Sequence, residues 1–294
     1  MRLLVTGGTG FIGTALLDCL LGRAADVVVL SRQSREDSAR CRFVTALDEL
    51  PDNEVIDGVI NLAGASLAAH RWTERYKREV ISSRMVTTAA VLDLIRRLDS
   101  PPSVLLNASA IGYYGHHGDE RLDEASAINE GFAQQLCSDW EALASEAQAV
   151  GTRVCLLRLG VVLDSDGGAL AQMDKSFRLG IASWLGSGRQ WLSWVHRKDV
   201  VAAMLFLLER EDLQGPFNIT APEPVTGRQL CQSLKAHHRT FLTAGVPGPL
   251  MKLIVGEMAE ELLLNGQRVV PERLEKAGFE FSYRDIEAAL AAVY

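Results

Sequence analysis

The sequence predicts an α/β fold of the Rossmann type: a doubly wound parallel sheet with a smaller C-terminal α/β lobe. Through the first half of the chain, short apolar runs rich in branched residues alternate with amphipathic helical patterns. Runs of this kind suit strands that are buried on both faces of a parallel sheet. A glycine-rich segment joins the first apolar run to the first helical pattern. Strands and helices alternating in this order indicate a doubly wound sheet.

The elements of the first half are predicted from these runs and from helical spacing. The predicted strands are Leu3–Val5, Val27–Leu30, Val59–Leu62, Val104–Leu106 and Val154–Leu157. Helices are predicted where apolar residues recur every three or four positions, from Ile81 to Ile95 and over about Asn129 to Val150.

After about Val162 the alternation gives way to a cluster of glycine and tryptophan residues. The elements predicted beyond it are a helix over Asp199–Leu208, a strand over Phe217–Ile219 and helices over Pro247–Leu264 and Asp285–Val293. We predict a Rossmann domain over residues 1–163, to which residues of about 195–220 return, and a substrate-facing lobe over residues 164–294. The lobe includes a helical extension from about residue 245. Asp199 is expected to cap its helix.

Composition and charge exclude several classes of partner. The 294 residues are 48% hydrophobic and 23% charged, and a globular chain of this length buries about 75% of its unfolded surface without metals or disulfides. A formal net charge of −7 argues against nucleic acid and anionic membranes, which attract basic surfaces. No apolar run approaches the roughly 20 residues of a membrane span.

The five cysteines are scattered without a C-x-x-C pair, which is typical of reduced and mostly buried thiols. The first predicted strand begins at Arg2, so no secretory leader is expected. We therefore expect a cytoplasmic protein, with an organelle matrix as the alternative. Histidines, cysteines and carboxylates do not recur at metal-ligand spacing, so no metal site is expected.

The glycine-rich segment has the spacing of a dinucleotide-binding loop. In such a loop the first glycine takes a tight turn, the second lets the backbone approach a pyrophosphate, and the third allows the helix to pack on the strand. The free N–H groups at the helix N-terminus then bind phosphate oxygens. The candidate cofactor-binding residues here are Gly7, Thr9, Gly10, Phe11, Ile12 and Gly13.

Ser31 and Arg32 come directly after the strand predicted to end at Leu30. A site for NAD places Asp or Glu there to hold the ribose 2′-hydroxyl, whereas an arginine accommodates a 2′-phosphate. The nearest carboxylates, Glu36 and Asp37, come several residues later. The sequence therefore favours NADP(H) over NAD(H).

Small residues follow the strand predicted to end at Leu62. Ala63 and Gly64 would let a cofactor ribose lie against the backbone at the carboxyl edge of the sheet, where such folds bind ligands. A plain turn is the alternative interpretation.

Two residues of the second half are candidates for substrate contact. Arg189 lies in a glycine-rich loop flanked by Trp191 and Trp194, and its planar fork of donors suits a phosphate or a carboxylate. The alternative is a turn whose tryptophans pack between the two lobes. His196 would line the cleft or serve as a buried structural histidine.

Together these segments resemble the extended short-chain dehydrogenase/reductase superfamily, and more narrowly its atypical branch of epimerase-family proteins, which includes the bacterial YfcH-like proteins. The resemblance covers essentially the whole chain. Its further segments are Arg71–Thr73, Ser83–Arg84, Ser109–Gly115, Arg158–Leu163, Gly186–Trp191, Trp194–His196, Asp199, Ala221–Pro224, Gly266–Arg268 and Pro271–Phe279. The last two match the carboxyl-terminal extension of that branch.

The resemblance implies cofactor contacts by position. They fall on Ser31, Arg32, Leu62, Ala63, Glu79, Arg84 and Val161. Arg84 would face the cleft from a helix and neutralise the pyrophosphate, with an ordinary surface charge as the alternative. Val161 would contribute a main-chain contact near the nicotinamide.

Working members of the superfamily use a serine and a Tyr-x-x-x-Lys pair, in which the lysine lowers the pKa of the tyrosine that moves the proton. Ser109 matches the serine, but the next helix has Ala133 and Cys137 at the Tyr-Lys spacing. No lysine occurs between Arg78 and Asp174. The usual proton relay is therefore absent from the sequence.

Three interpretations of the chemistry stay open. Tyr113 or Tyr114 could act as the acid from the loop before the helix, so the candidate catalytic residues are Ser109, Tyr113 and Tyr114. Alternatively, hydride transfer could proceed with a proton delivered by substrate or water. In the third interpretation the protein binds NADP(H) without chemistry, as a sensor or regulatory module.

The resemblance and the residues together predict an NADP(H)-binding oxidoreductase of the epimerase or reductase type. Such a protein would exchange hydride at a carbinol or carbonyl carbon of an unassigned small molecule. The alternative function is the non-catalytic NADP(H)-binding module. The resemblance also leaves a homodimer open, because relatives pair through long helices beside their sheets.

Overall fold

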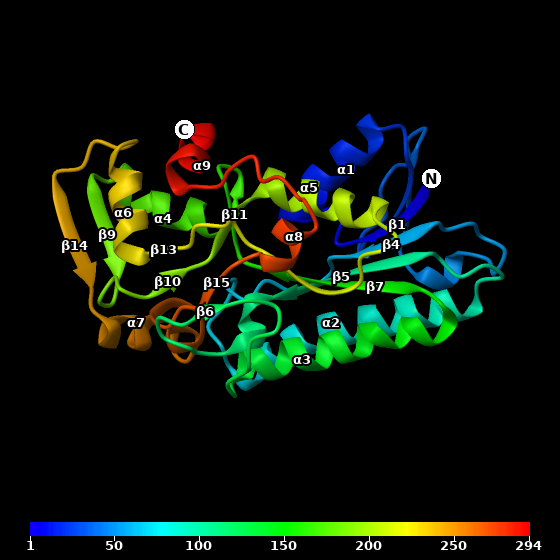
Figure 1. Ribbon diagram of the computed structural model, residues 1–294, viewed down its shortest axis with the longest axis horizontal. Helices are drawn as coiled ribbons and strands as arrows, with labels where there is room; N and C mark the ends of the chain where they lie inside the picture. The colour runs from blue at the N-terminus through cyan, green and yellow to red at the C-terminus, as the bar shows by residue number, and fades with distance from the viewer.

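The computed structural model describes residues 1–294 and is built around a seven-stranded sheet in which neighbouring strands are all parallel (Figure 1). Its strands are β1 (Arg2–Thr6), β2 (Asp26–Leu30), β3 (Cys41–Val44), β4 (Gly58–Asn61), β5 (Val104–Ala110), β7 (Arg153–Leu159) and β12 (Gly215–Ile219). They lie in the order β12-β7-β5-β4-β1-β2-β3. The predicted doubly wound fold is confirmed. Six of the seven strands were predicted, and the strand that was missed is β3, at the edge of the sheet.

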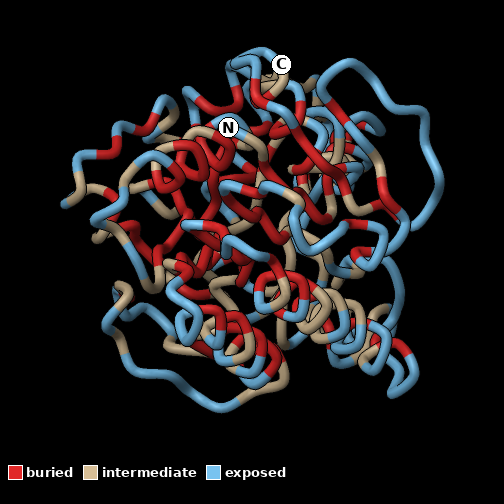
Figure 2. Tube along the Cα trace, turned by 90° about the vertical axis from the view of Figure 1, so that its right-hand side faces the viewer, coloured by how far each residue is buried: buried red, intermediate tan, exposed pale blue.

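Helices cover both faces of this sheet. α1 (Phe11–Gly22) and α5 (Arg197–Glu209) lie on one face, and α2 (Glu74–Arg97) and α3 (Phe132–Ser145) lie on the other (Figure 1). Leu3 and Val5 of β1 belong to the core beneath α1 and α5, whereas Leu4 belongs to the core beneath α2 and α3. Because both faces are buried, the strands form unbroken apolar runs in the sequence. Figure 2 shows the buried stretches gathered in the interior of the molecule.

α2 is the longest helix, with 24 residues, and it carries both acidic and basic side chains. Its buried residues Val91, Leu92 and Ile95 pack into the core on its side of the sheet. Neither α2 nor any other helix is apolar enough over a sufficient length to cross a membrane.

The second lobe consists of short paired strands and the helices packed on them. Its elements are β8 (Val161–Asp164), α4 (Gly168–Arg178), β9 (Ile181–Leu185), β10 (Trp191–Leu192), β11 (Trp194–His196), β13 (Val225–Thr226), α6 (Gly227–Lys235), β14 (Leu242–Val246) and α9 (Ile286–Val293). A separate core that contains the fully buried Phe177 and Trp194 holds them together. Between β11 and β13, the chain returns to the large sheet as α5 and β12.

The segment after β14 differs from the helix predicted over Pro247–Leu264. α7 (Gly248–Val255) ends at Gly256, whose φ of 68° is a conformation that glycine adopts readily. A short π-helix, η4 (Ala259–Leu264), follows. β15 (Arg268–Val269) then pairs with β6 (Arg121–Leu122), and α8 (Glu272–Lys276) leads toward α9.

Asp199 does not cap α5, so that prediction was wrong. The N-cap is His196, whose Nδ1 accepts a hydrogen bond from the backbone N–H of Lys198 at 3.1 Å. The Asp199 carboxylate instead accepts bonds from the backbone N–H groups of Ser282 and Tyr283, both at 2.9 Å. Asp199 thus fastens the C-terminal segment to α5 through contacts that are distant in sequence.

Candidate functional site

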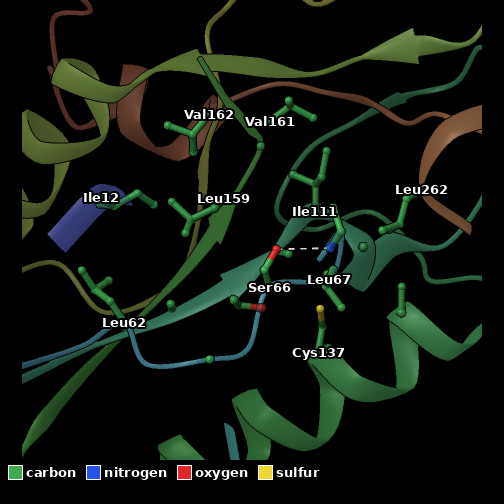
Figure 3. A pocket seen from close by; sticks show the side chains of 18 of the residues that line it. Ile12, Leu62, Ser66, Leu67, Ile111, Cys137, Leu159, Val161, Val162 and Leu262 are labelled. Carbon is green, nitrogen blue, oxygen red and sulfur yellow. Dashed lines mark hydrogen bonds between the residues drawn. The ribbon is translucent and has the colours of Figure 1, made fainter. Parts of the chain in front are cut away.

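A cavity of about 520 Å³ opens at the carboxyl edge of the large sheet. Its walls come from the segments that follow β1, β4, β5 and β7, together with parts of α2, α3 and the C-terminal segment (Figure 3). In doubly wound sheets, ligands bind outside the carboxyl ends of the strands, at the point where the strand order reverses. The reversal here lies between β1 and β4, so this cavity is the candidate ligand site.

Three glycines shape the loop between β1 and α1. Gly7 has a φ of 69°, and a Cβ on it would lie 2.7 Å from the carbonyl carbon of Leu62. A Cβ on Gly13 would lie 2.2 Å from the carbonyl oxygen of Gly7, so α1 can pack here only without a side chain at residue 13. A Cβ on Gly10 would meet only that same oxygen, at 3.2 Å. Of the three glycines, Gly10 is therefore the one whose position would best tolerate a side chain within the protein itself. It lines the cavity.

The first turn of α1 offers donors to this cavity. No side chain caps the helix, and the backbone N–H groups of Phe11 and Ile12 have no acceptor within the chain. Free N–H groups at a helix N-terminus, together with the positive end of the helix dipole, bind anions. The loop therefore fits the phosphates of a nucleotide.

Buried polar side chains beneath the cavity tie three strand ends together. Asn61 of β4 accepts a hydrogen bond from the Thr6 hydroxyl at 2.5 Å. Its amide nitrogen donates to Asn107 at 2.6 Å and to Thr88 at 2.9 Å. Trp140 of α3 donates to the same Thr88 hydroxyl at 2.8 Å. This network sets the spacing of the strand ends from which the cavity's loops leave.

Arg84 reaches the cavity from α2. Its guanidinium donates to the carbonyl oxygens of Ala65, at 3.1 Å, and Val80, at 3.0 Å, and lies 5.1 Å from the ring centre of Trp140. Room for it exists because Gly64 has no Cβ, which would lie 3.0 Å from the guanidinium carbon. Burial lowers the pKa of Arg84, although arginine stays protonated in proteins. No carboxylate is among its partners, so an anionic ligand would neutralise it.

Ser109 lines the cavity at the end of β5 and donates its hydroxyl proton to Glu141 of α3 at 2.7 Å. Glu141 pairs with Arg158 of β7 through two N–O contacts, both of 2.9 Å. Burial alone would lower the pKa of Arg158, but the hydrogen bonds and the charge of Glu141 raise it overall. Because the carboxylate holds the Ser109 proton, the hydroxyl oxygen can accept a hydrogen bond from a ligand.

α3 presents Ala133 and Cys137, the two residues at the Tyr-Lys spacing, to the cavity. Figure 3 shows Cys137 among the lining side chains. Burial raises the pKa of the Cys137 thiol to about 11, so this side chain is uncharged at neutral pH. Neither a tyrosine nor a lysine lines the cavity. The cavity therefore lacks the groups of a Tyr-Lys proton relay.

The predicted cofactor-binding residues divide into two groups. Those that line the cavity are Gly7, Gly10, Phe11, Ile12, Gly13, Leu62, Gly64, Arg84 and Val161. Those outside its lining are Thr9, Ser31, Arg32, Ala63 and Glu79. The pairing of Thr6 with Leu30 nevertheless places Ser31 one strand away from Gly7, and Arg32 is exposed beside it.

The two candidate catalytic tyrosines lie outside the cavity's lining. Tyr114 is fully buried, donates to Asn218 at 2.6 Å and accepts from Arg158 at 3.0 Å. Burial raises the pKa of Tyr114 to about 12. The Arg158 guanidinium lies 3.4 Å from the ring centre of Tyr113. Both rings pack around Arg158, so we do not assign proton transfer to either.

The two candidate substrate residues also lie away from this cavity. Arg189 lines a second cavity together with Asp119 and Trp191. His196 is buried, and its ring packs against Tyr283 with 4.0 Å between the ring centres and a tilt of 30°. Burial lowers the pKa of His196, so it is neutral at neutral pH. Its contacts are those of the structural histidine that was the alternative interpretation.

The extension was predicted to belong to the substrate-facing lobe, but none of its residues was predicted to line the ligand site. Glu261, Leu262 and Gln267 line the cavity from this segment. Their place depends on long-range packing, in which Met258 is buried in a cluster with Trp72 of the β4–α2 connection. The segment's local pattern is that of an ordinary amphipathic helix, so no signal within it indicates a ligand.

The fold and the glycine loop define a Rossmann protein with a nucleotide-type site. The model of the NAD dependent epimerase/dehydratase family matches residues 3–220, and that of a domain of unknown function, DUF1731, matches residues 246–293. The chain therefore belongs to the NAD dependent epimerase/dehydratase family. The predicted resemblance to the epimerase-family branch of the short-chain dehydrogenase/reductases is confirmed.

Similar proteins span nearly the same length. An epimerase family protein of Mycobacterium bovis is 37% identical over 290 residues, which cover 97% of this chain and 95% of the relative. The crystal structure of the human epimerase family protein SDR39U1 with NADPH is 32% identical, with a TM-score of 0.89 over 100% of this chain and 99% of that one. The UDP-glucuronic acid 4-epimerase of Bacillus cereus, solved with UDP-glucuronic acid and NAD, is 16% identical with a TM-score of 0.79 over 100% and 98% of the two chains. That likeness shows a shared fold alone.

Proposed function

We propose that this chain binds NADP(H) in the cavity and acts as an oxidoreductase of the epimerase or reductase type. One observation carries the proposal: the free backbone N–H groups of Phe11 and Ile12 and the cationic side chain of Arg84 line the same cavity. Such donors match the pyrophosphate of a dinucleotide. The human relative that was solved with NADPH supports the same assignment.

The preference for NADP(H) rests on Arg32. This exposed residue follows Ser31 at the end of β2, one strand away from the glycine loop. A ribose 2′-phosphate beside that strand end would meet a guanidinium, and no carboxylate follows β2 directly to bind a 2′-hydroxyl instead.

The chemistry follows from the groups around Ser109. A bound nicotinamide supplies or takes up the hydride. Ser109 accepts a hydrogen bond from the substrate hydroxyl, because Glu141 holds the serine proton and Arg158 holds Glu141. The substrate carbon then changes between carbinol and carbonyl. With neither tyrosine nor lysine in the lining, the hydroxyl proton passes to water or to another group of the substrate.

An isotope experiment tests this function. The pure protein is incubated with NADPH deuterated at C4, each face separately, and with a small-molecule extract from its source. Mass spectrometry is expected to find a metabolite that gains one deuterium only when protein is present and only from one face. Ser109→Ala should lower the labelling while NADPH binding persists, since in this assignment Ser109 binds the hydroxyl group that the reduced carbonyl becomes.

The alternative function, a non-catalytic NADP(H)-binding module, predicts a different result. It is supported by the lack of a Tyr-Lys relay in the cavity. Confirmed NADPH binding without any labelled metabolite would favour this module over the enzyme. An extract passed through the same incubation with boiled protein serves as the control for non-enzymatic exchange.

Cofactor preference is tested by titrating NADPH and NADH against Arg32→Ala. Loss of charge-assisted hydrogen bonds worth about 1.5–3 kcal/mol should weaken NADPH binding about ten- to one-hundred-fold and leave NADH binding unchanged. Arg23→Ala is the matched control, because it removes the same charge at the far end of α1, where Arg23 pairs with Glu209. Equal effects of Arg32→Ala on both cofactors would contradict the preference.

A further inference from the structure

Hydrogen bonds attach the C-terminal extension to the rest of the second lobe beside the cavity. Gln190 donates a hydrogen bond to the carbonyl oxygen of Leu263 at 3.2 Å. The Ser193 hydroxyl donates to the carbonyl oxygen of Gln267 at 2.7 Å and accepts from the backbone N–H of Val269 at 2.8 Å. The stretch from Leu263 to Val269 is therefore held by direct hydrogen bonds to the two residues that flank β10.

This stretch is in direct contact with the second lobe and lies between two cavities. A Cβ on Gly266 would lie 1.8 Å from the carbonyl oxygen of Trp191, so the two backbones are in contact. Glu261, Leu262 and Gln267 line the candidate site, whereas Leu264 and Gly266 line the second cavity. The two cavities share no lining residue, and the extension separates them.

The separation leaves the cations of the second lobe outside the candidate site. Arg189 lines the second cavity, and Arg268 stacks on Trp191 at 4.6 Å. The only charged side chains that line the candidate site are Arg84 and Glu261. Arg84 contacts Gly64 near the glycine loop, where the dinucleotide would bind. The part of the site away from that loop therefore has no cation for a second diphosphate.

Glu261 faces this part of the site without a cationic partner. Its neighbours Glu257 and Glu260 pair with Lys77 and Lys252, respectively. Glu261 accepts only a backbone N–H bond, from Ala133 at 3.4 Å. An anionic substrate would meet an unpaired carboxylate there, and repulsion of this kind is an effective means of excluding a wrong ligand.

The remaining walls are apolar. Leu67, Ile111, Leu136 and Leu262 line the same cavity as Ser109, and Figure 3 shows Leu67, Ile111 and Leu262 among its side chains. A cavity of about 520 Å³ lies within the range that holds one drug-sized ligand. If the dinucleotide occupies the side of the glycine loop, only a small molecule fits beside Ser109. That molecule needs a hydroxyl group, because the Ser109 oxygen is free only to accept.

We propose that the C-terminal extension restricts the substrate to a small, uncharged and mainly apolar hydroxyl compound and excludes nucleoside-diphosphate sugars. This inference rests on the proposed NADP(H) binding. It gives the extension, whose sequence matches a domain of unknown function, the role of a substrate-selecting wall. Leu262 supplies its apolar surface and Glu261 its negative charge.

Calorimetric titrations test the inference on the full chain. NADP⁺ is titrated first, and its isotherm reports on the proposed function alone. The NADP⁺-loaded protein is then titrated with cyclohexanol, 1-phenylethanol and UDP-glucuronic acid. At least one alcohol is expected to bind at least about tenfold more tightly than the UDP-sugar, equivalent to about 1.4 kcal/mol.

Variants of the wall link this selectivity to the extension. Leu262→Trp should weaken alcohol binding by narrowing the space beside Ser109, whereas Leu262→Ala should improve binding of the bulkier alcohol. Leu253→Trp is the control, because Leu253 is 73% exposed on α7, outside the cavity. Glu261→Gln should reduce the ratio of alcohol affinity to UDP-sugar affinity several-fold. Glu260→Gln should leave this ratio unchanged.

Two results would overturn the inference while leaving the proposed function intact. One is tighter binding of UDP-glucuronic acid than of every alcohol to the NADP⁺-loaded protein. The other is the absence of any saturable alcohol binding that responds to either Leu262 variant. Failure of NADP⁺ itself to bind would instead contradict the proposed function, on which the inference depends.

Discussion

Arg158 and Glu141 form an ion pair directly behind Ser109, with only 4% and 7% of their side chains exposed. The pair joins β7 to α3, and Tyr113 and Tyr114 pack around its guanidinium. Glu141 lies on α3, four residues after Cys137. The pair thus orients Ser109 through Glu141, but it faces no ligand itself, because neither residue lines the cavity.

Removing one partner of this pair is expected to destabilise the fold strongly. Glu141→Ala leaves the Arg158 charge buried and unpaired, which should lower the free energy of unfolding by about 3–5 kcal/mol. The double variant Glu141→Leu with Arg158→Met should recover most of that loss, because it buries no charge. Urea denaturation measures both.

The exposed pair of Arg96 with Glu146 provides the control. Glu146→Ala should change the free energy of unfolding by less than about 1 kcal/mol. A Glu141→Ala variant as stable as the wild type would show that the pair does not hold α3 against β7 as described.

Two alanine substitutions in the glycine loop should separate folding from cofactor binding. Gly13→Ala places a Cβ 2.2 Å from a carbonyl oxygen, so it should lower the thermal midpoint markedly. Gly10→Ala makes one contact of 3.2 Å, so it should change stability little while weakening NADPH binding, since it intrudes where the loop faces the cavity. Thermal unfolding and NADPH fluorescence titration measure the two effects. If Gly10→Ala bound NADPH as tightly as the wild type, the loop would not hold the pyrophosphate.

Arg84→Gln should weaken NADP(H) binding without unfolding the protein. Arg84 bonds two backbone carbonyls that glutamine can still reach in part, but only the guanidinium carries the charge that a pyrophosphate needs. Loss of a charge-assisted bond of about 1.5–3 kcal/mol corresponds to about ten- to one-hundred-fold weaker binding. The wild type should also lose affinity with rising salt more steeply than the variant. Arg78→Gln, an exposed neighbour on α2, is the control. An unchanged NADPH affinity in Arg84→Gln would remove Arg84 from the cofactor site.

Local sequence patterns were sufficient to predict the large sheet. Leu3, Leu4 and Val5 alternate between two cores, so their apolar run indicated a strand buried on both faces. The spacing of Gly7, Gly10 and Gly13 indicated the loop, because each position in such a turn has its own steric requirement. These features depend on neighbours within one strand-turn-helix unit.

Contacts between distant segments could not be predicted in this way. Asp199 has the position of a helix cap, yet its carboxylate binds the backbone of Ser282 and Tyr283. Nothing in the local pattern of α3 singles out Glu141, because its partner Arg158 lies on another element. The place of Glu261 in the cavity wall depends on how the extension folds back over α3. Charged residues of this kind have the same local pattern whether they face water, a partner or a ligand.

Cys137 and Cys155 should react with iodoacetamide slowly, and their reaction rates should keep rising with pH beyond the point at which free cysteine levels off. Burial raises the pKa of each thiol to about 11, and the thiolate is the reactive form. At pH 8 their alkylation should be about two orders of magnitude slower than that of free cysteine, with rates that continue to rise toward about pH 11, where free cysteine has levelled off. NADPH should slow Cys137 further, because Cys137 lines the cavity, and should leave Cys155 unchanged, because Cys155 does not. Peptide mass spectrometry after timed alkylation measures both sites in one sample. Equal protection of the two cysteines would indicate that NADPH acts by stabilising the whole fold, and no protection of Cys137 would place the cofactor away from α3.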